Sequence, residues 1–149
     1  MSISSPNNSV VTEEQVITPE VKQFIDIDEK TKQELLTQVE EQGMVIVHCS
    51  FSASKTVGIR IWNSTYLEDQ ETGSKSQLLH ALNITCAPSW ELVMDGTTKR
   101  FILIFSALPK TCQIFHFIEE VPDSYGFEIY GIKRNASDVY NVRINDSVF

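Results

Sequence analysis

The sequence predicts a mainly β protein, a two-layer β-sandwich preceded by one N-terminal helix. Short segments rich in β-branched residues follow one another from residue 44 onward, and turn residues interrupt them roughly every ten residues. Apolar residues at helical spacing occur only before that point. We therefore divide the 149 residues into a flexible polar tail (1–17), an acidic, partly helical segment (18–43) and a β-sandwich domain (44–149).

The segment before the sandwich contains one well-defined helix, predicted over residues 28–42. Asp28 is a suitable N-cap, and Leu35, Leu36 and Val39 are spaced three and four residues apart, so they share one face. Gly43 stands where a left-handed residue commonly ends a helix. Residues 18–27 are open to two interpretations. Thr-Pro-Glu at 18–20 is typical of a helix start, whereas residues 24–27 alternate like a strand.

Nine strands are predicted in the remainder of the chain. They cover residues 44–49, 56–62, 66–67, 77–82, 90–94, 99–106, 113–119, 127–132 and 139–144. Residues 101–105 are apolar on both faces, which indicates a strand covered on both sides. The apolar face of the predicted helix is one candidate for that cover.

The charge of the chain excludes two classes of partner. The formal net charge is −8, and residues 1–43, with nine acidic residues and three lysines, contribute −6 of it. Nucleic-acid binding and adsorption to anionic membranes both require basic surfaces, so we expect neither partner. The N-terminus lacks the basic and apolar regions of a secretory signal, and the three cysteines show no disulfide spacing. These features favour a cytoplasmic location.

The titratable residues form no recognisable catalytic or metal-binding motif. His48, His80 and His116 lie far apart, and the adjacent His48 and Cys49 point to opposite faces of a strand. Cys86 is the most exposed cysteine by its loop position, but no basic neighbour lowers its pKa. The adjacent carboxylates Glu119 and Glu120 diverge at a strand end. We expect no metal and no cofactor.

Arg60 and Trp62 share a strand face, and this pair has the composition of an interface hot spot if the face is exposed. The alternative is that Trp62 packs in a second apolar layer that the stem of Arg60 covers. With Tyr66 and His80 they make up the candidate interaction surface. Trp90, which follows a proline turn, is predicted to enter the core.

Several strand-and-turn patterns resemble those of uncharacterised bacterial immunoglobulin-like β-sandwich domains. The resemblance covers residues 44–144. Three groups of segments carry it: 59–62, 64–67 and Asp69; then 78–81, 83–84 and 87–88; and finally 101–105, 108–110 and 117–120. It implies an immunoglobulin-like sandwich. It implies no reaction and no functional residue, because the family has no assigned activity.

These observations favour a non-catalytic module for protein–protein interaction or assembly, whose partner is another protein or a second copy of the chain. One alternative is a carrier that holds a small molecule or lipid in an internal apolar cavity. A third is a small hydrolase or isomerase, which requires His80, His116 and Glu119 to converge in one pocket.

Overall fold

The computed structural model describes residues 2–3, 21–121 and 126–145. Within these residues there are one helix and eleven strands. In chain order they are β1 (Ser2–Ile3), β2 (Lys22–Phe24), α1 (Glu29–Glu41), β3 (Val45–Ser52), β4 (Val57–Arg60), β5 (Tyr66–Asp69), β6 (Lys75–Leu82), β7 (Glu91–Val93), β8 (Thr98–Phe105), β9 (Ile114–Ile118), β10 (Glu128–Lys133) and β11 (Val139–Asn145).

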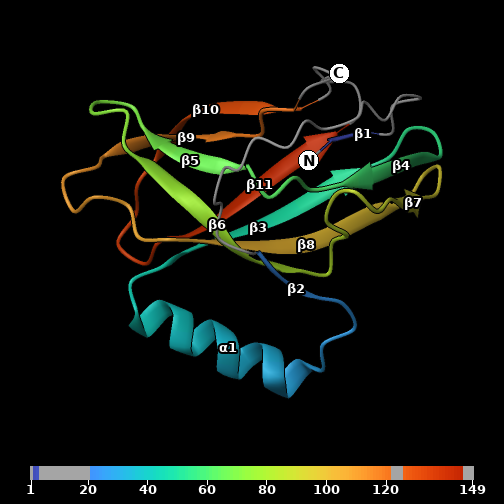
Figure 1. Ribbon diagram of the computed structural model, residues 1–149, viewed down its shortest axis with the longest axis horizontal. Coiled ribbons are helices and arrows are strands. Elements are labelled where there is room, and N and C mark those ends of the chain that lie inside the picture. Colours follow the sequence, from blue (N-terminus) through green and yellow to red (C-terminus); the bar gives the residue numbers. More distant parts are fainter. Residues whose placement is uncertain (1, 4–20, 122–125, 146–149) are drawn as a thin grey trace, which may run out of the picture.

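The main sheet is a strongly curled, mixed half-barrel (Figure 1). Its strand order is β10-β9-β5-β6-β8-β3-β11, and β2 joins the last residues of β6. The pairs β11–β3 and β2–β6 are parallel and the others are antiparallel. The prediction of a mainly β chain with an N-terminal helix is thus confirmed. The two stacked layers of an immunoglobulin-like sandwich are not clearly formed.

A smaller sheet, β1-β4-β7, prolongs the ladder between β3 and β8. Val45 pairs with Phe105, Ser52 with Thr98 and Val57 with Val93, so one antiparallel register runs through both ladders. Residues 53–56 and 94–97 interrupt the pairing. Two hydrogen bonds hold the interruption together, from Ala53 N–H to the carbonyl of Thr97 (3.0 Å) and from Gly96 N–H to the carbonyl of Ala53 (2.9 Å). The four strands therefore form one long, bent ribbon.

The core fills the concave side of the half-barrel. Alternate residues of each strand point into it, as Val45, Val47, Cys49 and Phe51 do on β3. Aromatic rings meet edge to face within it: Phe105–Phe117 at 5.7 Å, Phe117–Phe127 at 4.7 Å and Phe115–Tyr140 at 4.9 Å between ring centroids. Large side chains therefore occupy the space where the carrier hypothesis places an apolar cavity.

Helix α1 lies across the outer face of the sheet (Figure 1). Asp28 caps it as predicted, accepting a hydrogen bond from Thr31 N–H at 2.8 Å, and Gly43 follows it with φ of 73°. Leu36 and Val39 are buried in one cluster, and the sheet residues of that cluster are Ile46, Leu82, Ile102 and Ile104. The helix is therefore the predicted cover of the strand that is apolar on both faces.

The nine predicted strands correspond to β3–β11, with ends that differ by a few residues. The strand interpretation of residues 24–27 is wrong for 25–27, because β2 ends at Phe24 and the chain turns at Asp26, whose φ is 57°. The proposed helix start at 18–20 lies outside the described residues. Of the predicted tail, the structure describes Ser2–Ile3, which pair with Arg60 and Ile59 of β4. The other residues of 1–17 lie outside the described residues.

Candidate functional site

The outer face of the half-barrel changes from apolar to cationic along three neighbouring strands. On β3 the outward residues are Ile46, His48 and Ser50. The pairing with β8 and β11 extends each of them into a row of three. In order from the helix, the rows are Ile104–Ile46–Val139, Ile102–His48–Asn141 and Arg100–Ser50–Arg143. Helix α1 packs on the apolar row and on Ile102 of the second row, and the other residues of the second and third rows extend beyond its cover.

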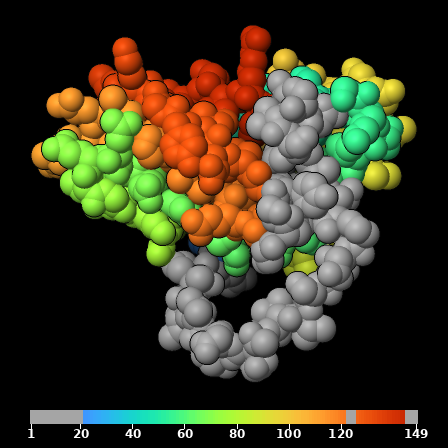
Figure 2. All heavy atoms as spheres, turned by 90° about the horizontal axis from the view of Figure 1, so that it is seen from above, coloured from blue at the N-terminus to red at the C-terminus, as the bar shows by residue number. Residues whose placement is uncertain are grey.

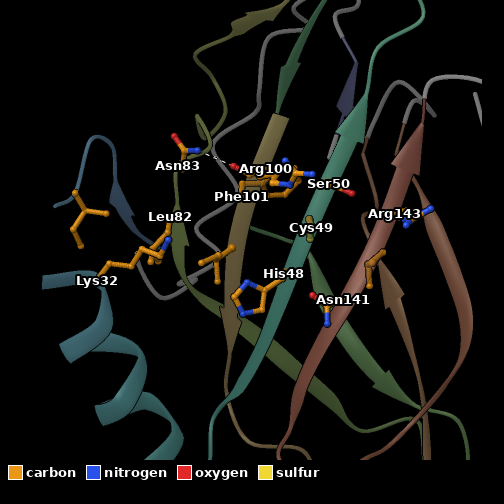
Figure 3. Close-up of a pocket in the computed structure, with 13 residues that line it drawn as sticks. Lys32, His48, Cys49, Ser50, Leu82, Asn83, Arg100, Phe101, Asn141 and Arg143 are labelled. Atoms are coloured by element: carbon orange, nitrogen blue, oxygen red, sulfur yellow. Dashed lines mark hydrogen bonds between the residues drawn. The ribbon is translucent and has the colours of Figure 1, made fainter. Parts of the chain in front are cut away.

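A groove of about 580 Å³ lies over the two outer rows (Figure 3). It is lined by Ile27, Lys32, His48, Cys49, Ser50, Leu82, Asn83, Arg100, Phe101, Ile102, Asn141, Val142 and Arg143. Lys32 of α1 flanks the groove, and β3 and β11 supply His48, Ser50, Asn141 and Arg143 (Figure 3). Several elements distant in sequence thus build one concave surface.

The groove is positive although the chain is acidic. Lys32, Arg100 and Arg143 line it, and the lining includes no aspartate or glutamate. Of these three cations, Lys32 forms an ion pair within the described residues, with the exposed Glu29 at 3.7 Å. The wall is fixed by Asn83, whose side-chain amide donates to the carbonyl of Arg100 at 2.7 Å. The site therefore favours an anion.

His48 lies in the middle row of the groove and is partly buried. Burial, followed by the nearby charge of Lys32, lowers the pKa of its imidazole. The ring is consequently neutral near pH 7, where it can both donate and accept a hydrogen bond.

The sequence-predicted residue Arg60 lies on the ribbon, away from the groove lining. Its guanidinium carbon is 3.7 Å from the ring centroid of Trp90 and 4.8 Å from that of Trp62. The same group donates to the carbonyl of Pro88 at 2.9 Å. Arg60 is only 5% exposed, and both indoles are half-buried. Trp90 was predicted in the core, and this is wrong: it packs on a cation at the surface because it stands on the outward face of the ribbon.

Two large apolar side chains continue that outward face. Leu92 is 71% exposed and Met94 is 58% exposed. Both follow Trp90 at intervals of two residues, the spacing that places side chains on one side of a strand. We call Trp62, Trp90, Leu92 and Met94 the ribbon surface.

Tyr66 and His80 complete the sequence-predicted set. Tyr66 is buried and donates to Glu120 at 2.8 Å, while the adjacent Glu119 accepts a hydrogen bond from Trp62 N–H at 3.1 Å. These contacts bring Tyr66 to the same side of the molecule as Trp62. His80 instead contacts Phe24 of β2, with ring centroids 5.9 Å apart. The structure therefore separates His80 from the other three residues.

The three residues of the hydrolase hypothesis have different neighbours. His80 contacts Phe24, and His116 contacts Tyr130 at 4.8 Å and accepts a hydrogen bond from Gly131 N–H at 3.1 Å. Glu119 is 2% exposed and binds the backbone of Trp62. These contacts of the described residues do not join any two of the three, so the geometry gives this hypothesis no support.

The cysteines offer no activated nucleophile in the described part of the chain. Cys49 and Cys112 are buried, and burial raises the pKa of both thiols. Cys86 is half-buried, and burial raises its pKa to about 11. Over the same described ranges, no group of three or more His, Cys, Asp or Glu side chains is placed to hold a metal ion.

The groove was missed by sequence reasoning. Arg100 and Arg143 are 43 positions apart, and they flank Ser50 only because β8 and β11 are the two neighbours of β3. The alternation of apolar and polar residues at 47–51 is a local signal for one outward face, and it was not used in the prediction. The strand order that completes the site carries no such local signal.

Comparison with known proteins gives no relative. No family model, no curated protein and no solved structure matches the chain. Among the described residues, no helix has the length and apolar character needed to cross a membrane.

Proposed function

We propose that the chain is a non-catalytic interaction module that assembles with a second copy of itself through the ribbon surface. The observation that carries this proposal is the pair of exposed apolar side chains, Leu92 and Met94, beside the Arg60–tryptophan stack. Tryptophan, methionine and arginine are enriched at the centres of protein interfaces. Solvent-exposed leucine and methionine on one strand face form the kind of patch that marks such sites.

The position of β7 favours self-association. In the order β1-β4-β7 it is an edge strand, and Figures 1 and 2 show β4 and β7 together at one end of the molecule. An edge strand presents unpaired backbone groups that a strand from another chain can bind. Two copies related by a two-fold axis would pair β7 with β7 and bury Leu92 and Met94 of both.

The expected association is weak. Burial of a leucine or methionine side chain contributes about 1.5–3 kcal/mol. Association costs roughly 4–15 kcal/mol in lost freedom of motion. Four buried side chains contribute about 6–12 kcal/mol, so with an association cost near the lower end of its range, about 4–6 kcal/mol, a net of about 5.5 kcal/mol remains, which corresponds to a dissociation constant on the order of 100 µM.

Sedimentation velocity over about 10–500 µM protein tests the proposal. The double variant L92S/M94S should stay monomeric at concentrations where the wild type associates. The control is Y130S, which removes a side chain that is 59% exposed on β10. A wild type that is monomeric throughout, or a Y130S variant as impaired as the double variant, would contradict the proposal.

The carrier alternative predicts a different result. Native mass spectrometry of the purified chain should show the bare polypeptide mass and a dimer if assembly is the function. A co-purifying small molecule on a wild-type chain that stays monomeric at every concentration would favour the carrier instead.

A further inference from the structure

The cationic row of the groove places two arginines on either side of one hydroxyl. Arg100 and Arg143 are the register partners of Ser50 on its two neighbouring strands. Because neighbouring strands lie about 4.7–4.9 Å apart, the two arginine backbones are roughly 10 Å apart across Ser50. Both side chains are exposed and can reach a group that lies above the hydroxyl.

This arrangement suits an oxyanion. A guanidinium presents its N–H donors as a planar fork that matches carboxylate and phosphate oxygens. Neither Arg100 nor Arg143 forms an ion pair with another described residue. An anion between them would relieve their mutual repulsion and accept a hydrogen bond from Ser50.

The remaining part of the groove suits an apolar group. Ile27, Leu82 and Ile102 line it on the side of α1. At about 580 Å³ the groove has the size of a small-molecule site, much larger than an isolated ion requires. His48 and Asn141 lie between the two ends and can hydrogen-bond a linking polar group.

We propose that this groove binds a small amphipathic molecule that carries one oxyanion group, a phosphate or a carboxylate. The oxyanion lies over Ser50 between Arg100 and Arg143, and the apolar part extends along Ile102 and Leu82 towards Ile27. This inference goes beyond the proposed assembly, because it uses different residues from the ribbon surface.

The charged groups around His48 make the binding pH-dependent. Lys32 of α1, Arg100 of β8 and Arg143 of β11 all line the same groove, and none of the lining residues is acidic. Protonation of His48 adds a further cation, so affinity for a carboxylate, which stays ionised above about pH 5, should rise as the pH falls below about 6.5; a phosphate monoester loses part of its own charge in the same range. A bound anion should in turn raise the pKa of His48.

Titrations followed by ¹H–¹⁵N NMR test the proposal with three probes: inorganic phosphate, hexyl phosphate and hexanoate, each against sodium chloride at matched ionic strength. We expect the amide signals of His48, Ser50 and Arg143 to shift. Hexyl phosphate or hexanoate should bind at least about ten-fold more tightly than inorganic phosphate, since burying the chain adds affinity. The tighter of the two identifies the anion.

Substitution of the arginines provides the control. R100Q and R143Q should each weaken binding of the preferred probe about ten-fold, and R143K should weaken it less because the charge remains. K110Q removes a lysine from the exposed loop after Pro109 and should bind as the wild type does. The proposal fails if no organic probe shifts these signals beyond the effect of chloride, or if R100Q and R143Q bind as tightly as K110Q.

Discussion

Replacement of Arg60 by methionine tests the contribution of the tryptophan stack to stability. Each cation–π contact contributes about 0.5–2 kcal/mol, and a hydrogen bond from a charged donor contributes about 1.5–3 kcal/mol. Among the described contacts of Arg60 are two of this kind, at 3.7 and 4.8 Å, and a hydrogen bond donated to the carbonyl of Pro88. Methionine restores the apolar stem and removes the cost of burying a charge. The net loss in the free energy of unfolding should be about 2–3 kcal/mol.

Tryptophan fluorescence is a specific assay for this change. The chain has two tryptophans, and both stack on Arg60. In R60M the native emission should shift to the red because the indoles gain contact with water. The urea midpoint, followed by fluorescence and by circular dichroism, should fall by about 1–2 M, given a slope of about 1–3 kcal/mol per molar for small proteins.

R134M is the matched control. Arg134 pairs with Asp138 at 3.0 Å and donates to the carbonyls of Pro109 and Cys112, and neither tryptophan is among these partners. R134M should destabilise the chain and leave the native emission unchanged. An R60M variant with the emission and urea midpoint of the wild type would show that the stack makes no net contribution.

Two further predictions concern the helix and the histidines. V39A removes a side chain on the buried face of α1 that is 2% exposed, and it should lower the free energy of unfolding by about 1.5–3 kcal/mol. T37A changes an exposed position of the same helix and should alter that free energy by less than about 0.5 kcal/mol. Thermal unfolding followed by circular dichroism compares the two variants, and equal losses would contradict the packing of α1 on the sheet. Burial lowers the pKa of both His48 and His80, and the nearby charges of Lys32 and Lys22, respectively, lower it further. These histidines therefore take up protons at lower pH in the folded state than in the unfolded state. Their contribution to stability is complete above the unfolded pKa of about 6.5 and is lost as the pH falls through the folded values. As the pH is lowered from about 7.5 to about 5, the urea midpoint of the wild type should decrease, and that of the double variant H48Q/H80Q should decrease less. The same pH dependence of the midpoint in both proteins would refute this reasoning.

The elements of the fold were largely predictable because their signals are local. Asp28, the apolar spacing at 35–39 and Gly43 are close in sequence, and each alone indicates part of α1. Strands β3–β11 were bounded by turns within a few residues. The short strand β1 was missed, since two residues carry no period, and its pairing with β4 depends on a partner more than 50 positions away.

The arrangement of the elements was less predictable because it depends on distant pairing. The antiparallel β3–β8 ladder and the parallel β3–β11 ladder each join segments about 50 or more residues apart. Curling into a half-barrel follows from these pairings and from irregularities such as that between Leu78 and His80. The position of Trp90 was mispredicted for the same reason. Trp90 lies at the surface because it packs beside Arg60, a residue distant in sequence that lies across the ribbon.

Both candidate sites lie on the outward face of one continuous ribbon. On the inward face, Val45, Val47, Phe51, Val57 and Ile59 must fill the core, so their chemistry is set by packing. The outward face is free of that constraint. It carries apolar residues where α1 covers it, cations and hydrogen-bonding groups in the groove, and tryptophans with exposed Leu92 and Met94 at the end of the ribbon. Leu92 and Met94 are 71% and 58% exposed, and most of the groove lies beyond the cover of α1. The groove and the ribbon surface are therefore the places where binding partners should be sought, and because they use different residues the two can be tested by independent substitutions.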